Sequence, residues 1–244
     1  LMKPLLVLAA FPVVLMGWMS CSRSGTGHAA LPDPRTVDKS VPEYKNPFHP
    51  STYAHFVARK DYRKTYDVYK DDTLLNRQPK KSRKIFVCLD EQRGQYLVDG
   101  LVAMDFPLSS GVKAYPTKTG DYAVISKKED HTSNLYGKMY DAEGKCINYN
   151  AESTDPVPEG GRFDGSPMPY WQRLTNAGLG LHVGKVRRHP VSHGCVRLPR
   201  NVAEILYRQT SIGTPVTIQK TPLPVSEAQK IPPAQQQESE GRKQ

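Results

Sequence analysis

The sequence has few cysteines, and their spacing is not that of a usual metal site. Only four occur in 244 residues, with no paired CxxC and no HExxH. It also lacks zinc-finger, ribonucleoprotein and basic-region motifs, which disfavours nucleic-acid binding. No internal repeat is visible. The few chemically distinctive residues must therefore be read in their local context.

The sequence contains no apolar run long enough for a permanent transmembrane helix. The longest run, residues 5–19, has about 15 residues, whereas a spanning helix needs about 20. Lys3 precedes this run and Ser20 and Cys21 follow it, a layout typical of a signal peptide over residues 1–21. Cys21 is also a candidate for lipidation. We expect an exported protein of the periplasm or cell envelope, with Cys21 lipidated, or with ordinary cleavage or an uncleaved anchor instead.

Acidic residues are fewer than basic ones, which gives a formal net charge of +10. This charge indicates an anionic environment, although a solvated basic face would explain it equally well. The hydrophobic fraction of 38% suffices for a folded core.

The composition divides the chain into four parts. After the signal peptide, residues 22–82 read as a tether and a polar N-terminal region, with at most a short helix after residue 51. Residues 83–220 carry the strand-like patterns and are expected to form the folded domain. Residues 221–244 are rich in Pro, Gln and charge and are predicted to be disordered.

Short strand patterns dominate the foldable part. From residue 85 the sequence predicts three strands, with turns around Gly94 and at Asp99–Gly100, followed by a strand after Gly120. Further strands are expected at 178–183 and 214–219. Only residues 201–210 have helical periodicity. We therefore predict a mainly β fold, a sandwich or partly closed barrel with one or two short helices.

The stretch "SHGCVRL" over residues 192–198 concentrates the chemistry. It should place Cys195 in a loop directly before a helix that begins at Pro199 or Asn201, where free backbone amides stabilise a thiolate. Gly194 permits a sharp turn that can point N–H groups at an oxyanion. A thiol nucleophile also needs a base, and His182, His189 and His193 lie within reach along the sequence.

Metal binding and a buried structural role are two other interpretations of these residues. Zinc could bind His182, His189, His193 and Cys195, but Pro190 interrupts the helix that would align them. A buried structural cysteine fits Cys88 in "IFVCLD" and not Cys195, whose neighbours are polar or basic. We therefore expect no metal.

The segment "LHVGKVRRHPVSHGCVRLP" resembles the active-site signature of the YkuD-type L,D-transpeptidases. The resemblance extends over residues 84–219 through "SPMPYWQRL", "HTSNLYGKMYD" and "FPLSSGVKAYPTKTGDYAVISK". It implies a YkuD-like β fold. The loop before Cys195 is shorter than in many members, and Val183 stands where Gly is frequent.

The resemblance implies a role for each matching residue. Cys195 corresponds to the nucleophile and His182 to its base, steadied by the backbone carbonyl of Val183. The implied oxyanion and supporting residues are Ser192, His193, Gly194 and Arg197. The implied substrate contacts are Tyr170, Trp171, His131 and Tyr136.

The implied activity is acyl transfer on peptidoglycan stem peptides without a cofactor. Cys195, partly or wholly thiolate, would attack the amide after the third stem residue and form a thioacyl-enzyme. An amine acceptor gives a 3-3 cross-link or a wall-attached protein, and water gives an L,D-carboxypeptidase. A noncatalytic wall-binding lipoprotein with this fold is the alternative from another class of protein. Because a catalytic thiol must stay reduced, only Cys88 and Cys146 could form a disulfide, and a free Cys88 is equally compatible.

Overall fold

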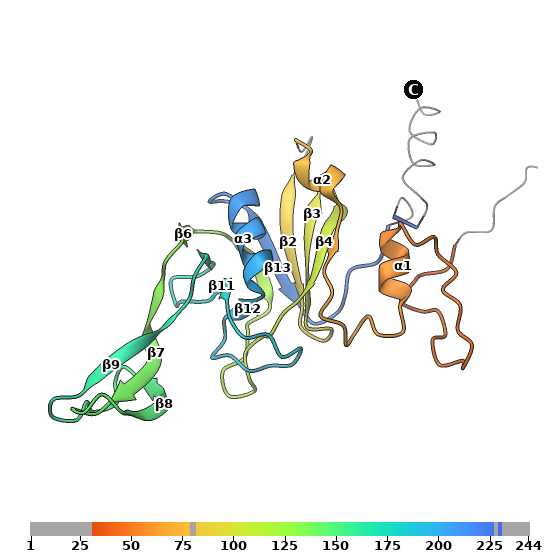
Figure 1. Cartoon of the computed structure of the whole chain (residues 1–244). Helices are drawn as coiled ribbons and strands as arrows, with labels where there is room; N and C mark the ends of the chain where they lie inside the picture. The colour runs from red at the N-terminus through yellow and green to blue at the C-terminus, as the bar shows by residue number, and fades with distance from the viewer. Residues whose placement is uncertain (1–30, 79–81, 227–228, 231–244) are drawn as a thin grey trace, which may run out of the picture. The chain divides into compact units, whose positions relative to one another are not determined.

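A computed structural model describes residues 31–78, 82–226 and 229–230. Strands predominate in this part of the chain (Figure 1). Its helices are α1 (Tyr53–Ala58), α2 (Asp72–Asn76) and α3 (Arg200–Gln209). The predicted mainly β fold is confirmed, with three short helices instead of one or two. The predicted signal peptide and Cys21 lie outside the described residues.

The largest sheet has six strands. In spatial order they are β1 (Tyr69–Lys70), β4 (Leu101–Pro107), β3 (Arg93–Val98), β2 (Arg83–Cys88), β13 (Pro215–Gln219) and β5 (Gly120–Ala123). The turn predicted at Asp99–Gly100 joins β3 to β4, and both residues have positive φ, 52° and 84°. Such values are typical of a two-residue hairpin turn.

The predicted turn around Gly94 is wrong by a few residues. Gly94 lies inside β3, and the chain turns before it, where Gln92 has a φ of 48°. A Cβ on Gly94 would lie 2.2 Å from Cε2 of Phe106. The glycine is therefore needed for close packing of an aromatic ring and not for a turn.

Two smaller sheets complete the fold. The four-stranded sheet has the order β12 (Val196–Leu198), β11 (Gly180–Val183), β10 (Trp171–Arg173) and β6 (Ser126–Lys128). The three-stranded sheet has the order β8 (Cys146–Glu152), β7 (Thr132–Tyr140) and β9 (Arg162–Pro167). The sequence did not predict this last sheet, because its strands expose large apolar side chains such as Ile147 and Tyr149 and lack clear alternation.

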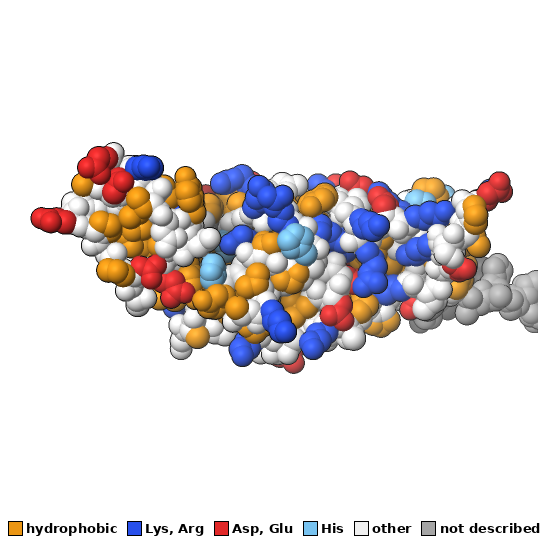
Figure 2. Space-filling model, turned by 90° about the horizontal axis from the view of Figure 1, so that it is seen from below, with side chains coloured by type: hydrophobic (Ala, Val, Ile, Leu, Met, Phe, Trp, Pro, Cys, Tyr) orange, Lys and Arg blue, Asp and Glu red, His pale blue; other side chains and the backbone are white. Residues whose placement is uncertain are grey.

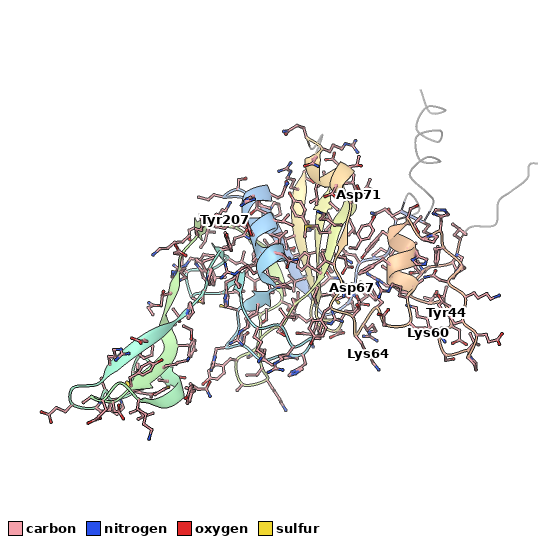
Figure 3. All side chains as sticks on the ribbon, viewed as in Figure 1. Tyr44, Lys60, Lys64, Asp67, Asp71 and Tyr207 are labelled. Carbon is pink, nitrogen blue, oxygen red and sulfur yellow. The ribbon has the colours of Figure 1, made fainter. Side chains whose placement is uncertain are left out.

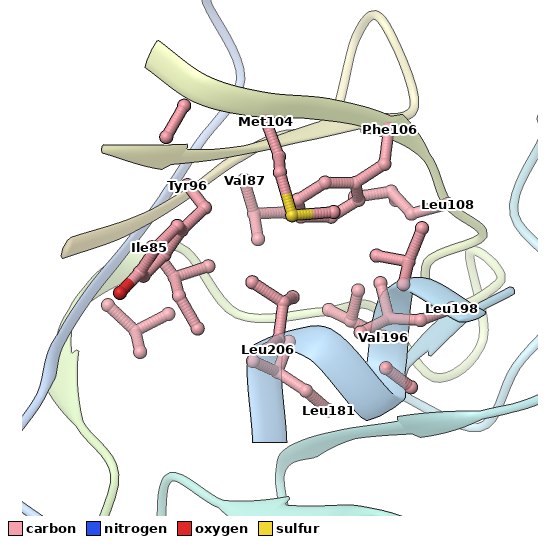
Figure 4. Close-up of a cluster of buried hydrophobic side chains, with 14 of the residues drawn as sticks. Ile85, Val87, Tyr96, Met104, Phe106, Leu108, Leu181, Val196, Leu198 and Leu206 are labelled. Carbon is pink, nitrogen blue, oxygen red and sulfur yellow. The ribbon is translucent and has the colours of Figure 1, made fainter. Parts of the chain in front are cut away.

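The main core lies between the six-stranded sheet, the four-stranded sheet and α3 (Figure 4). The six-stranded sheet contributes Ile85, Val87, Tyr96, Met104 and Phe106. Leu181, Val196, Leu198 and, from α3, Leu206 face them. Since these side chains are almost fully buried, the core fixes one face of β11 and β12.

Helix α3 begins where the sequence predicted it, with Pro199 at the N-cap position. Val202 and Leu206 are buried and Ile205 is half-buried, as the helical periodicity indicated. However, β12 separates Cys195 from this helix. The predicted loop directly before a helix is therefore wrong, and the environment of Cys195 is set by the neighbouring strand β11.

The predicted polar N-terminal region packs more than a tether would. Phe48, Tyr53, Phe56 and Tyr62 form a second apolar cluster with Val102 of β4. Tyr44 and Lys60 lie beside α1 (Figure 3), and the Tyr44 hydroxyl donates to the Ala58 carbonyl at 2.9 Å. Residues 44–62 therefore form a layer attached to the six-stranded sheet.

The predicted disordered tail also differs from the structure in its first residues. Val225 is buried in the second cluster. The Gln229 side chain donates to the Val102 carbonyl at 3.0 Å and accepts from its N–H at 2.9 Å. This pairing mimics an added strand and holds these residues on β4. Residues 231–244 lie outside the described part of the chain.

Candidate active site

Strand pairing brings Cys195 and His182 to one face of the four-stranded sheet. Strands β11 and β12 run parallel, with Leu181 opposite Val196 and His182 opposite Arg197. Leu181 and Val196 point into the core. Because side chains alternate along a strand, His182, Arg197 and the preceding Cys195 point to the opposite face.

This opposite face borders a cavity of about 490 Å³. A volume of this size is typical of a small-molecule or peptide site. Strands β7, β8, β10 and β11 contribute to its wall, and so does the loop before β12. Among the predicted site residues, it is lined by Cys195, His182, Ser192, His193, Gly194, Arg197, Trp171, His131 and Tyr136.

The tautomer of His182 follows from its partner. Its Nδ1 atom lies 2.8 Å from the Val183 carbonyl oxygen, which can only accept. Nδ1 therefore carries the proton, and Nε2 is left with a lone pair. Burial lowers the pKa of His182 to about 4, against the opposing effect of the Val183 hydrogen bond. His182 is thus neutral at pH 7, and its Nε2 atom can accept a proton.

Cys195 is also favoured in its neutral form. Its Sγ donates to the Gly178 carbonyl at 3.3 Å. Burial raises the pKa of the Cys195 thiol, although the Gly180 N–H and the Arg197 charge both oppose this shift. The sequence analysis predicted a partly or wholly formed thiolate. The raised pKa of Cys195 and the lowered pKa of His182 instead favour a neutral thiol and a neutral imidazole. Proton transfer would then accompany attack on the substrate.

The Ser192 hydroxyl stabilises the loop that carries the thiol. It donates to the Cys195 carbonyl at 2.5 Å and accepts from the Gly194 N–H at 3.2 Å. Gly194 has a φ of +115°, which strongly favours glycine. Because the Gly194 amide already donates to Ser192, it is a weaker candidate for an oxyanion donor than the sequence indicated.

Thr117 holds the same loop from the other side and was not singled out from the sequence. Its hydroxyl donates to the Gly194 carbonyl at 2.6 Å and accepts from the Gly111 N–H at 2.8 Å. Thr117 is the first Thr of the "PTKTG" segment, so the signal was present without an indicated role.

His193 packs between two tyrosines. Its ring lies 4.3 Å from that of Tyr136, with the planes 17° apart, and 4.8 Å from that of Tyr115. The Tyr115 hydroxyl also donates to Glu152 at 3.2 Å. These contacts join the loop before Cys195 to the β7–β9 sheet. This packing is consistent with a supporting role for His193 and not with the role of base.

The predicted substrate contacts do not all lie at the cavity. His131 and Trp171 line it with ring centroids 5.0 Å apart, and the Trp171 ring is 5.9 Å from His182. Tyr170 is absent from the lining and packs against Tyr207 of α3 at 5.6 Å. Its position indicates a structural role, so the predicted substrate contact of Tyr170 lacks geometric support.

The alternatives involving the other cysteines and histidines find no counterpart in the described residues. His189 is exposed on the loop after β11, and no three His, Cys, Asp or Glu side chains in the described ranges cluster as metal ligands would. Cys88 and Cys146 are both free thiols, so the disulfide considered between them is absent. No helix within the described residues has the length and apolarity to cross a membrane.

Gly180 is the residue of β11 that lies beside Cys195. A Cβ at this position would lie 2.5 Å from Cη2 of Trp171 and 2.6 Å from the Gln172 carbonyl oxygen. We expect Gly180→Ala to lower the free energy of unfolding by about 1–3 kcal/mol, because the added methyl group would overpack this position. Denaturant titration measures this loss. The double variant with Trp171→Phe should recover part of it, and no recovery would exclude the ring clash as the cause.

The fold and the site define a class of protein. It is a mainly β protein with a cysteine and an oriented histidine on one sheet face beside a cavity. The family model of the YkuD L,D-transpeptidase catalytic domain matches residues 82–218, more than half of the chain. The protein therefore belongs to the YkuD L,D-transpeptidase family.

Known L,D-transpeptidases are similar to parts of this chain. A probable L,D-transpeptidase 3 from Mycobacterium tuberculosis is 32% identical over 121 residues, which are 47% of this chain and 38% of the relative. An L,D-transpeptidase structure from Mycobacterium smegmatis is 22% identical, covers 57% of this chain and 58% of its own, and has a TM-score of 0.44. A mutant of an Enterococcus faecium L,D-transpeptidase is 27% identical, with coverages of 57% and 50% and a TM-score of 0.41.

Proposed function

We propose that this protein is a cysteine-dependent L,D-transpeptidase that acts on peptidoglycan stem peptides through a thioacyl-enzyme. The observation that carries the proposal is the placement of Cys195 and His182 on one sheet face, with Nε2 of His182 free to accept a proton. The catalytic domain is assigned to residues 83–220, and the family match over residues 82–218 supports these bounds.

The proposed reaction has two halves. In the first, Nε2 of His182 takes the thiol proton as Sγ of Cys195 attacks the carbonyl carbon of the third stem residue. The C–N bond breaks, and the terminal D-amino acid leaves with that proton on its nitrogen. In the second, an acceptor amine attacks the thioester, His182 takes its proton, and the thiolate is released and reprotonated. No cofactor takes part.

The acceptor defines the biological product. A stem-peptide amine gives a 3-3 cross-link, a protein lysine attaches that protein to the wall, and water makes the enzyme an L,D-carboxypeptidase. A noncatalytic wall-binding lipoprotein is the alternative from another class. It has no need for a buried neutral histidine with a fixed tautomer beside the thiol. We place the protein in the periplasm or cell envelope, with Cys21 as the site of a possible lipid anchor.

The test is to incubate the purified protein with tetrapeptide stems and identify the products by mass. We expect a cross-linked dimer together with the free D-amino acid, and neither with Cys195→Ala. Tripeptide without dimer would replace transfer by carboxypeptidase activity, and a conjugate with an added protein would identify the protein acceptor. No product from the wild-type protein would leave the wall-binding alternative as the better assignment.

A further inference from the structure

Within the part of the chain that the structure describes, the cavity beside Cys195 is lined by cations and by no carboxylate. Lys118, Arg173 and Arg197 are its charged lining residues. Burial lowers the pKa of each lining histidine, so His131, His182 and His193 favour the neutral form and add no cation of their own. In Figure 2, Lys and Arg side chains gather over the central part of the chain, whereas Asp and Glu predominate at the β7–β9 end. The cavity therefore favours an anionic group.

Strand register places Arg173 in one row with the nucleophile. Arg173 of β10 lies opposite Gly180 of β11. Strands β11 and β12 run parallel with Leu181 opposite Val196, so Gly180, one residue earlier, lies beside Cys195 of the neighbouring segment. Two steps of about 4.8 Å between strands put the Arg173 and Cys195 backbones about 10 Å apart. Directly opposite residues point to the same sheet face, and both line the cavity.

The Trp171 ring covers β11 between Arg173 and Cys195. Gly180 has no side chain, and the Trp171 ring packs closely over it. An aromatic surface thus lies between the thiol and the guanidinium. A peptide residue attached to the attacked carbonyl could rest on this surface, with its far end at Arg173.

Arg173 has no partner among the described residues that would explain its charge. Within the described residues its guanidinium makes no ion pair and no hydrogen bond, although the residue is half-buried. Its neighbour in sequence, Gln172, points to the other face and accepts from Thr210 at 2.6 Å. Arg197 differs, because its stem packs on Gly184 and its charge acts on Cys195. A half-buried guanidinium without a partner is suited to bind a carboxylate.

We propose that Arg173 binds the C-terminal carboxylate of the acyl-donor peptide and so determines specificity for donors with a free terminus. This inference rests on the proposed function. In that reaction the leaving group is the terminal residue, so its carboxylate lies one residue from the carbonyl that Cys195 attacks. Arg173 lies at a matching place, one strand beyond Gly180, and a guanidinium pairs with a carboxylate through two parallel hydrogen bonds.

The test compares a tetrapeptide stem that has a free C-terminal carboxylate with the same peptide as its C-terminal amide. Binding is measured as protection of Cys195 from iodoacetamide, which requires no turnover, and kcat/KM for peptide consumption is measured in parallel. We expect the wild-type protein to prefer the free acid by about 10- to 100-fold, as for loss of a charge-assisted hydrogen bond. Arg173→Gln should reduce this preference to nearly 1, and Arg173→Lys should keep part of it.

Lys128→Gln is the matched control. Lys128 lies opposite Trp171 on the same sheet and has the same charge, but it does not line the cavity. This variant should keep the wild-type preference for the free acid. Equal preference in Arg173→Gln and wild type, or no preference in wild type, would overturn the assignment. Binding with the expected preference but without product would instead reject the proposed function and retain the role of Arg173 in binding.

Discussion

His182→Gln is expected to slow acylation of Cys195 by about 100- to 10,000-fold at pH 7, the usual contribution of a general base. Nε2 of His182 is an available acceptor because Nδ1 is held by the Val183 carbonyl at 2.8 Å. Glutamine keeps a polar side chain of similar length but cannot take the thiol proton. The rate is measured with a carbapenem as the addition of one acyl mass, and peptide mapping assigns the adduct to Cys195.

The thiol proton can be lost in two ways, to His182 during attack or to water before it. The pH dependence of the acylation rate distinguishes them. The pKa of His182 is lowered to about 4, so its base form is present throughout the range from pH 5 to 8. The wild-type rate should be nearly constant there, since the thiol remains protonated and the base remains neutral. In His182→Gln only the free thiolate reacts, and the raised pKa of Cys195 makes the rate increase about tenfold per pH unit.

His189→Gln serves as the control, because His189 is exposed and does not line the cavity. It should leave both the rate and its pH profile unchanged. A wild-type rate that rises tenfold per pH unit from pH 5, with the same values in His182→Gln, would remove His182 as the base. Cys146→Ser in every protein removes the other partly exposed thiol of the described residues.

The sequence predicted the parts of the site that depend on a short motif. The reactive residues of the "SHGCVRL" stretch are recognisable in one short segment. The family resemblance supplied the pairing of Cys195 with His182. The strands around residues 85–107 could also be predicted from the sequence, because short apolar runs and the Asp99–Gly100 turn are local signals. The resting protonation state was not accessible, since it depends on burial that only the fold creates.

Long-range register accounts for what the sequence could not provide. Arg173 and Cys195 are 22 residues apart in sequence and become neighbours across two strand pairs. The packing of His193 with Tyr115 and Tyr136 likewise joins three separate segments. The packing of the polar N-terminal region could not be predicted from the sequence, because the partner of its polar groups, a buried ion pair in the six-stranded sheet, is distant in sequence.

The buried ion pair of the six-stranded sheet joins Arg93 to Asp105. Arg93 and Asp105 are paired at side-chain exposures of 1% and 0%. The hydroxyls of Tyr53 and Tyr62 donate to Asp105 at 2.6 and 2.8 Å. Burial raises the pKa of both phenols, so they stay protonated. Asp105→Asn should lower the free energy of unfolding by about 3–5 kcal/mol, because Arg93 becomes a buried charge without a counter-ion.

The same change should also loosen the N-terminal layer before the rest of the chain unfolds. The Arg93 guanidinium donates to the carbonyls of Tyr62, Thr65 and Asp67, and Tyr53 and Tyr62 belong to the apolar cluster of that layer. Denaturant titration measures the total loss. Limited proteolysis of Asp105→Asn should give cleavage between residues 44 and 67 at denaturant concentrations where the wild-type protein resists it.

A double-mutant cycle tests whether the charge itself is responsible. Arg93→Met alone leaves Asp105 buried without its cation and should be strongly destabilising, but adding it to Asp105→Asn should cost much less than in the wild-type background. Tyr62→Phe removes one neutral donor and should cost only about 1 kcal/mol. Strictly additive losses for Arg93→Met and Asp105→Asn would contradict the pair as the attachment of the N-terminal layer, and the apolar cluster around Phe56 would then be its main source of stability.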